Sequence, residues 1–284
     1  MATTYSSRTT NPIGGSQVAG GGLWYNLPID GFNKRDAWAI FNDFETFGQF
    51  DATNDWAITA VNTPGGGNVT FALVNSATTT FSTHGVLGAV TGTTVSSGYT
   101  VQALGSGTLN GQGITPIAGR SCAFEIKVGT TTATGWTDCS WFFGLCAATA
   151  SSTIPISNVG ALTASSTGLA GFHHLSTSAT GIPSFVAAGT NSTVVTVAPT
   201  VSKAIPAGVQ STTTVDGFRR FGLRFDAANR VTWYIDGVAM AATVLASSYA
   251  NNTPLFPSFS VMTKSASATS TAWRIDYVAL GATR

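Results

Sequence analysis

The clearest alternation of hydrophobic and polar positions lies between Arg219 and Met240. Large apolar side chains occupy every second position there, at Phe221, Leu223 and Phe225 and again at Val231, Trp233 and Ile235. A strict period of two predicts half-buried strands with one face on a core. Asn229 and the pair Asp236-Gly237 suit turns that need a positive φ. We therefore expect three successive strands, at about 219–226, 231–235 and 238–244, which must lie on a second apolar layer.

Short alternating or apolar runs recur along the rest of the chain and are separated by Gly, Ser, Thr and Pro. They predict further strands at 56–58, 68–74, 86–87, 99–104, 114–117, 122–128, 141–146, 171–174, 184–186, 194–197, 256–263 and 272–280. The run 141–146 is apolar on both faces, which is typical of a central strand that is covered on two sides. Turn signals about 8–12 residues apart favour a sandwich or barrel. Residues 147–170 contain few large side chains and predict a long surface loop.

Two segments resemble a known family. The segment FGLRFDAANRVTWYIDGVAM, residues 221–240, resembles the strand–turn–strand–Asp-Gly–strand segment of concanavalin A-like (LamG-like) jelly rolls. The segment PLFPSFSVMTKSASATSTAWRIDYVALGATR, residues 254–284, resembles the final strands of such domains in tailed-phage virion structural proteins, where a short DYV strand closes the sheet. The resemblance covers roughly residues 30–284. It implies an all-β fold, a jelly-roll β-sandwich.

The resemblance also bears on how the chain divides. Residues 1–23 are mostly Ser, Thr and Gly, a composition that predicts an extended N-terminal arm. We expect the sandwich domain to span residues 24–284. Residues 32–50 are compatible with a short helix, because Trp38, Phe41 and Phe44 recur every three residues. They are also compatible with an extended edge, and we favour the strand because similar jelly rolls open with one.

Charge and cysteine content limit the partners and the cellular compartment that we expect for this protein. Charged residues make up 9% of the chain and the net charge is +1, whereas ordinary domains carry about 25% charged residues. Such a surface does not attract nucleic acid or membrane lipid at long range, and a free monomer tends to associate. Two interpretations of this low charge remain open. Either the chain is simply a Thr-rich β protein, or much of its surface is packed against neighbours in an assembly. The three cysteines, with no apparent signal peptide, fit synthesis in a reducing cytoplasm.

Few residues offer candidate chemistry. Asp43 and Glu45 lie two apart, but glucanases that share this jelly roll need a third carboxylate in the same series, so we interpret this pair as surface or paired carboxylates. Asp51, Asn54 and Asp55 carry oxygen atoms of the kind that Ca²⁺ binds. Their spacing is also typical of a turn with Asx hydrogen bonds, which we favour.

Histidines and tryptophans are the other candidates for binding a metal ion or a sugar. His173 and His174 are adjacent, so in a strand they face opposite ways and do not chelate one metal ion together. Trp24, Trp136 and Trp141 are candidates for stacking on sugar rings, although most tryptophans are expected in the core. We therefore predict no catalytic residues, no cofactor and no metal site.

These observations predict a non-enzymatic structural protein of a tailed-phage virion, in the first place a capsid decoration (cement) protein. The alternatives are a head or tail fibre subunit, a carbohydrate-binding adhesin that grips host glycans, and a divergent glycoside hydrolase. Expected partners are the major capsid protein or other virion proteins and further copies of the chain, with a glycan as an additional ligand. No nucleic acid or membrane is expected. The protein would be made in the host cytoplasm and reside on the capsid surface. Candidate partner contacts are Tyr5, Arg8, Trp24 and Tyr25.

Overall fold

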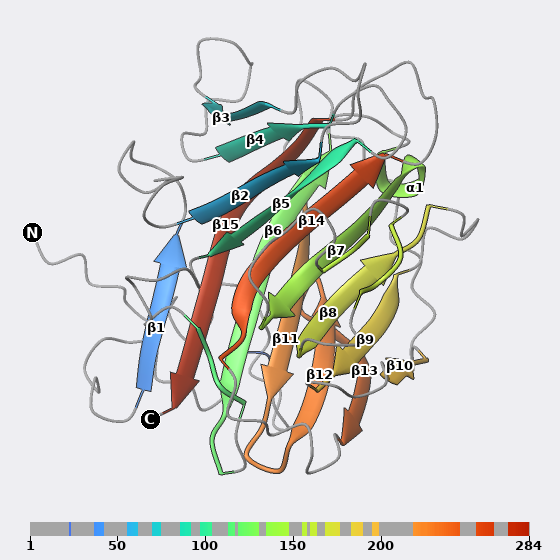
Figure 1. Ribbon diagram of the computed structural model, residues 1–284. Helices are drawn as coiled ribbons and strands as arrows, with labels where there is room; N and C mark the ends of the chain where they lie inside the picture. Colours follow the sequence, from blue (N-terminus) through green and yellow to red (C-terminus); the bar gives the residue numbers. More distant parts are fainter. Residues whose placement is uncertain are drawn as a thin grey trace, which may run out of the picture.

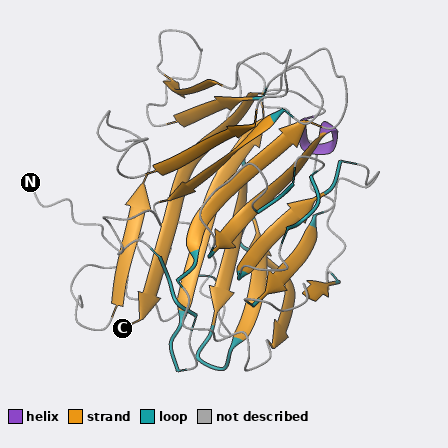
Figure 2. Cartoon of the chain, viewed as in Figure 1, coloured by secondary structure: helices purple, strands orange, loops and turns teal. Residues whose placement is uncertain are grey.

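The chain folds into two packed antiparallel β-sheets (Figure 1). The computed structural model describes residues 23, 37–42, 56–61, 70–74, 86–91, 97–103, 113–116, 119–130, 135–147, 155–157, 160–163, 168–176, 183–189, 195–198, 218–244, 254–263 and 272–283. Most of these residues lie in strands (Figure 2). The prediction of an all-β jelly-roll sandwich is therefore confirmed.

The first sheet has eight strands and contains the meander. Its order along the main path is β13 (Val238–Val244), β12 (Arg230–Ile235), β11 (Arg219–Phe225), β6 (Cys122–Thr130), β15 (Ala272–Thr283), β4 (Val86–Val90) and β3 (Thr70–Val74). Strand β1 (Ala37–Asn42) pairs with the C-terminal half of β15. The strand alternative for this part of residues 32–50 is therefore confirmed, and the remaining residues of that segment lie outside the described part.

The second sheet has seven strands. Its order is β10 (Val195–Val197), β9 (Ser184–Ala188), β8 (Leu169–His174), β7 (Cys139–Cys146), β14 (Phe256–Thr263), β5 (Gly98–Ala103) and β2 (Trp56–Val61). Strand β7 is buried along its whole length, as its two apolar faces predict. The single described helix, α1 (Gly135–Asp138), leads into β7.

The meander has the turns that its sequence predicts. Asn229 and Asp236 have φ values of 59° and 51°, and Gly237 follows at 79°. In the first turn, the Asp226 carboxylate accepts hydrogen bonds from the backbone N–H groups of Ala228 and Arg230, both at 2.9 Å. These contacts fix the register of the two flanking strands, so that apolar residues of both lie on one face.

The core lies between the two sheets and is rich in aromatic rings. The Trp136 ring lies 5.0 Å from the Trp273 ring and 5.8 Å from the Phe221 ring. Trp233 is fully buried and its Nε1–H donates to the carbonyl oxygen of Gly171 at 2.9 Å. This bond joins β12 of one sheet to β8 of the other, so Trp233 ties the layers together by packing and by a hydrogen bond.

Two local predictions were wrong. The described residues 114–116 do not form a strand, because Ile114 makes only an isolated bridge to Leu255. The described parts of 147–170 are not a surface loop throughout, since Ile156 is fully buried and β8 begins at Leu169. Trp136 and Trp141, two of the candidates for sugar stacking, are buried, which confirms for them the expectation that most tryptophans lie in the core.

Candidate functional site

The outer faces of the two sheets differ in charge. No strand of the seven-stranded sheet contains an Asp, Glu, Lys or Arg. The charged strand residues all lie in the eight-stranded sheet, where six are basic and two are acidic: Lys127, Arg219, Arg220, Arg224, Arg230, Arg274, Glu125 and Asp276. The outer face of the eight-stranded sheet is therefore the place where the described strands concentrate polar chemistry.

Strand register places these side chains in rows across β11, β6 and β15. Arg220 lies opposite Lys127, which lies opposite Tyr277. One row along, Gly222 lies opposite Glu125, which lies opposite Ala279. Because Phe221, Leu223 and their partners point into the core, these residues project from the other side of the sheet.

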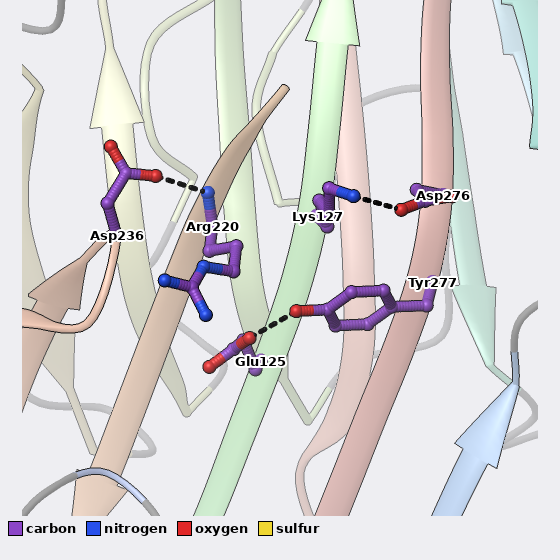
Figure 3. Close-up of polar contacts among 6 residues, drawn as sticks. All are labelled: Glu125, Lys127, Arg220, Asp236, Asp276 and Tyr277. Carbon is purple, nitrogen blue, oxygen red and sulfur yellow. Dashed lines mark hydrogen bonds and ion pairs between the residues drawn. The ribbon is translucent and has the colours of Figure 1, made fainter. Parts of the chain in front are cut away.

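Most of these charges have partners within the sheet (Figure 3). The Lys127 ammonium lies 2.5 Å from the Asp276 carboxylate, and Tyr277 Oη donates a hydrogen bond to Glu125 Oε1. The Asp236 carboxylate accepts from the backbone N–H of Arg220 at 3.0 Å and lies 3.5 Å from the Arg219 guanidinium. Lys127 also lies over the rings of Phe218 and Tyr277, at 5.2 and 5.9 Å from their centroids. The cluster therefore cross-links three strands.

The electrostatics of this face favour the neutral phenol of Tyr277. Burial raises the pKa of Tyr277 far above its ordinary value, and the Glu125 carboxylate raises it further. The positive charge of Arg220 acts in the opposite direction and is the smaller effect. Tyr277 is thus a hydrogen-bond donor that holds Glu125, rather than an activated nucleophile.

An apolar contact interrupts the polar rows at Gly222. Leu23 packs there against Ala123, Tyr234 and Ala279, next to Tyr277. Leu23 is the last residue of the segment that the sequence predicts to be an arm, and it is 1% exposed. The end of this segment therefore lies on the outer face of the eight-stranded sheet.

Part of the outer face of the seven-stranded sheet is covered in a different way. Residues 155–157 and 160–163 are joined by backbone hydrogen bonds, with Ser157 N–H donating to Ala161 O and Thr163 N–H donating to Pro155 O. In this arrangement Ile156 and Leu162 pack on an apolar surface formed by Phe142, Cys146, Leu169, Val186, Ala188 and Met262. This part of the sheet is therefore covered by the chain itself.

His173 helps to hold this cover. Its Nε2 lies 2.8 Å from the carbonyl oxygen of Gly160, which has a φ of 78°. Burial lowers the pKa of His173, more than the bond to Gly160 raises it, and neighbouring His174 lowers it slightly more. His174 points the other way, stacks on Trp141 and contacts Cys139 O through Nδ1. The prediction that the two histidines face opposite sides is confirmed.

Three further polar residues, on β5 and β14 of this sheet, are also buried. Thr100 and Ser260 share a hydrogen bond of 2.8 Å, and Gln102 Nε2–H donates to Cys146 O at 3.2 Å. All three side chains are at most 2% exposed. They stabilise the sheet and offer little accessible hydrogen-bonding surface to a ligand.

Among the described residues, no group of three or more His, Cys, Asp or Glu side chains is placed to hold a metal ion. Cys122 and Cys146 are buried, as predicted for cysteines that pack as small apolar residues, and so is Cys139. Within the same residues, no helix is long and apolar enough to cross a membrane.

Several sequence candidates lie outside the described residues. They are Asp43 and Glu45, the cluster Asp51, Asn54 and Asp55, and the four candidate partner contacts Tyr5, Arg8, Trp24 and Tyr25. Sequence reasoning missed Leu23 and the Glu125–Tyr277 pair. Glu125 and Tyr277 sit at polar positions of alternating strands, but only the strand order places them side by side.

Comparison with known proteins supports the fold. No protein-family model and no curated protein sequence matches the chain. Among solved structures, the endo-1,3-β-glucanase from Streptomyces sioyaensis is 14% identical and has a TM-score of 0.50, covering 87% of this chain and 96% of its own. A Bacteroides ovatus mixed-linkage glucan GH16 protein is 12% identical over 85% of this chain and 99% of its own, with a TM-score of 0.49. Winged bean acidic lectin is 11% identical over 87% and 98%, with a TM-score of 0.47.

The likeness to the Streptomyces sioyaensis glucanase and the two antiparallel sheets support a concanavalin A-like jelly-roll architecture, the fold that the sequence resemblance implies. Lectins and glucanases are both among the neighbours of this fold. At these identities the likeness concerns the fold alone, so it does not choose between sugar binding and hydrolysis.

Proposed function

We propose that this chain is a non-catalytic structural protein of a tailed-phage virion, acting as a capsid decoration protein. The main support is that the strands of the seven-stranded sheet are uncharged and that Ile156 and Leu162 of the same chain cover part of their outer face. A glycosidase needs two carboxylates beside an accessible sugar site, and the strands of this sheet carry none. A sheet without strand carboxylates suits permanent packing better than turnover of a sugar substrate.

Composition adds to this proposal. A chain with 9% charged residues and a net charge of +1 has little electrostatic protection against association. Such a surface is an advantage for a subunit that stays in contact with capsid neighbours. The resemblance of residues 254–284 to the closing strands of tailed-phage structural proteins is the reason for choosing a virion among possible assemblies.

The strands of the eight-stranded sheet do contain carboxylates, but their contacts disfavour hydrolysis. Glu125 is 1% exposed and accepts a hydrogen bond from Tyr277, while Asp276 is paired with Lys127. A general acid must reach the glycosidic oxygen and a nucleophile must reach the sugar carbon. The absence of enzymatic activity stays a prediction, which a reducing-sugar assay on β-1,3-glucan and mixed-linkage glucan would check.

Glycan binding is the second candidate, because the fold is shared with a glucanase of TM-score 0.50. Since Ile156 and Leu162 cover part of the outer face of the seven-stranded sheet, a sugar would have to bind outside that covered part. An adhesin of this kind would be present in few copies on a particle and would bind defined glycans on an array.

The deciding experiment is the copy number of this chain in purified particles of the virus that encodes it. Quantitative mass spectrometry against the major capsid protein should give a fixed ratio close to that of the capsid subunit. A few copies per particle together with array binding would favour the adhesin. Absence from the particle would contradict both virion roles.

A further inference from the structure

Gly222 is the one position of β11 where the outer face must carry no side chain. A Cβ atom built there would lie 2.4 Å from Leu23 Cδ2 and 3.2 Å from Leu23 Cδ1. Carbon atoms that are not bonded to each other pack at about 3.5–4.0 Å. Gly222 has no positive φ that would call for glycine. The absence of a side chain at this position is therefore explained by the space that Leu23 occupies.

The surroundings of Gly222 form a shaped site, which we name the Gly222 socket. Ala123 and Ala279 provide small side chains on neighbouring strands, and Tyr234 and Tyr277 provide the larger side chains beside them. Gly222 lies directly opposite Tyr234 on β12 and opposite Glu125 on β6, with Arg220 and Arg224 two residues away on β11. The socket thus accepts one branched apolar side chain within a polar surface.

The connection from Leu23 to the sandwich is long compared with the distance it must cover. Residues 24–36 separate Leu23 from β1. Thirteen residues in extended form span up to about 43 Å. Gly222 and β1 are three strand spacings apart in the same sheet, through β6 and β15, which is about 15 Å. The connection therefore has length to spare and does not force Leu23 into the socket of its own chain.

We propose that the Gly222 socket also accepts Leu23 from a second copy of this chain, so that neighbouring copies exchange their N-terminal segments. The same contacts form within one chain and between two chains, so exchange costs little contact energy. Three glycines, 20–22, directly precede Leu23 and present no side chain that would block its approach to the sheet. The low net charge of +1 leaves little repulsion between copies.

Crowding makes exchange competitive with self-docking. When copies are held side by side, the effective concentration of a neighbour's segment approaches that of the tethered segment, which is in the millimolar range for flexible linkers. The inference goes beyond the proposed virion role, because it requires only a second copy of the chain. It holds or fails in solution, whatever particle the chain belongs to.

The test is complementation between two full-length variants. Leu23→Ala has an open socket and no anchor, whereas Gly222→Val has an anchor and a blocked socket. The three atoms nearest to a Cβ at position 222 all belong to Leu23, so Gly222→Val should fold with its N-terminal segment displaced. Neither variant can pair with itself through the socket, but a mixture can place Leu23 of one chain into the socket of the other.

Sedimentation velocity and fluorescence energy transfer between labelled variants would measure the pairing. We expect a heterodimer in the equimolar mixture, with an apparent dissociation constant about tenfold or more below that of either variant alone. The double variant Leu23→Ala/Gly222→Val, mixed with Leu23→Ala, is the matched control and should give no heterodimer.

Circular dichroism and melting temperature confirm that each variant is folded, and Gly222→Ala replaces Gly222→Val if the larger side chain prevents folding. The proposal would be overturned if the mixture of folded variants stayed monomeric even at 100-fold the lowest protein concentration that the assay detects. It would also be overturned if the control mixture paired equally well.

Discussion

The two sheets of the sandwich stabilise their outer faces by opposite means. The strands of the seven-stranded sheet carry no charge, and apolar side chains of Ile156 and Leu162 cover part of their outer face. The eight-stranded sheet carries all eight charged strand residues, and its outer face is held by ion pairs, the Glu125–Tyr277 hydrogen bond and Leu23. Residues outside the strands therefore pack on both faces through apolar contact, but only the eight-stranded sheet also joins its own strands by polar contacts on that face.

This difference has a consequence for binding. An apolar cover is stable because removing it exposes hydrocarbon to water. On the eight-stranded sheet, Leu23 is the one described residue from outside the strands in the apolar cluster, so its departure uncovers less hydrocarbon than the loss of both Ile156 and Leu162 from the other face. The eight-stranded sheet is therefore the face on which contacts with other chains are more readily exchanged, which agrees with the location of the Gly222 socket.

The largest expected effect concerns the core between the two sheets. Trp233→Ala should lower the free energy of unfolding by roughly 3–5 kcal/mol, because it removes a large, fully buried ring and leaves Gly171 O without its indole donor. Denaturant unfolding of the purified variant would measure this. Trp233→Phe keeps most of the packing and should cost distinctly less. A loss below about 1 kcal/mol for Trp233→Ala would contradict the burial of this face.

Trp233 also shows what the sequence could predict. The period of two between Phe221 and Ile235 needs only local information, so strand phase, the Asn229 turn and the core face all follow from it. Leu23 and Ile156 were not predictable in this way. Each belongs to a short apolar run next to residues rich in Gly, Ser or Thr, and its burial depends on which sheet face lies beneath it. The Glu125–Tyr277 pair joins residues 152 positions apart and requires the strand order.

The second prediction concerns the cover of the seven-stranded sheet. Ile156→Ala should lower the free energy of unfolding by roughly 2–5 kcal/mol, since Ile156 is fully buried on that face. The loss should come with faster backbone hydrogen exchange in residues 155–163. Val244→Ala is a suitable control, because Val244 is 65% exposed and should change stability little. If Ile156→Ala behaved like this control, the face would be open and the argument against a binding surface there would fail.

The third prediction concerns the polar face. Tyr277→Phe should lower the free energy of unfolding by about 1.5–3 kcal/mol, the range for a hydrogen bond to a charged group, because Glu125 loses its phenol donor while remaining buried. Urea titration at neutral pH would measure the change. Tyr234→Phe removes a hydroxyl from the same face without leaving a buried carboxylate, so its effect should be smaller. Equal losses of unfolding free energy for the two variants would show that the hydrogen bond to Glu125 stabilises the fold no more than the Tyr234 hydroxyl does.

The smallest effect distinguishes the two faces by their response to acid. Because burial lowers the pKa of His173, the unfolded chain binds a proton at a higher pH than the folded one. The contribution of neutral His173 is therefore complete above about pH 6.5 and is lost as the pH falls towards the lower pKa of the folded state. One such group changes the unfolding free energy by at most about 1.4 kcal/mol per pH unit.

His173→Gln cannot titrate and keeps a side-chain donor that can reach Gly160 O. Unfolding measured from pH 7.5 to pH 5 should show a steeper decline for the wild type than for this variant, with the additional hydrogen exchange confined to residues 155–163. Parallel declines would show that acid acts through other groups, such as the carboxylates of the eight-stranded sheet, and that the bond between His173 and Gly160 does not secure the cover.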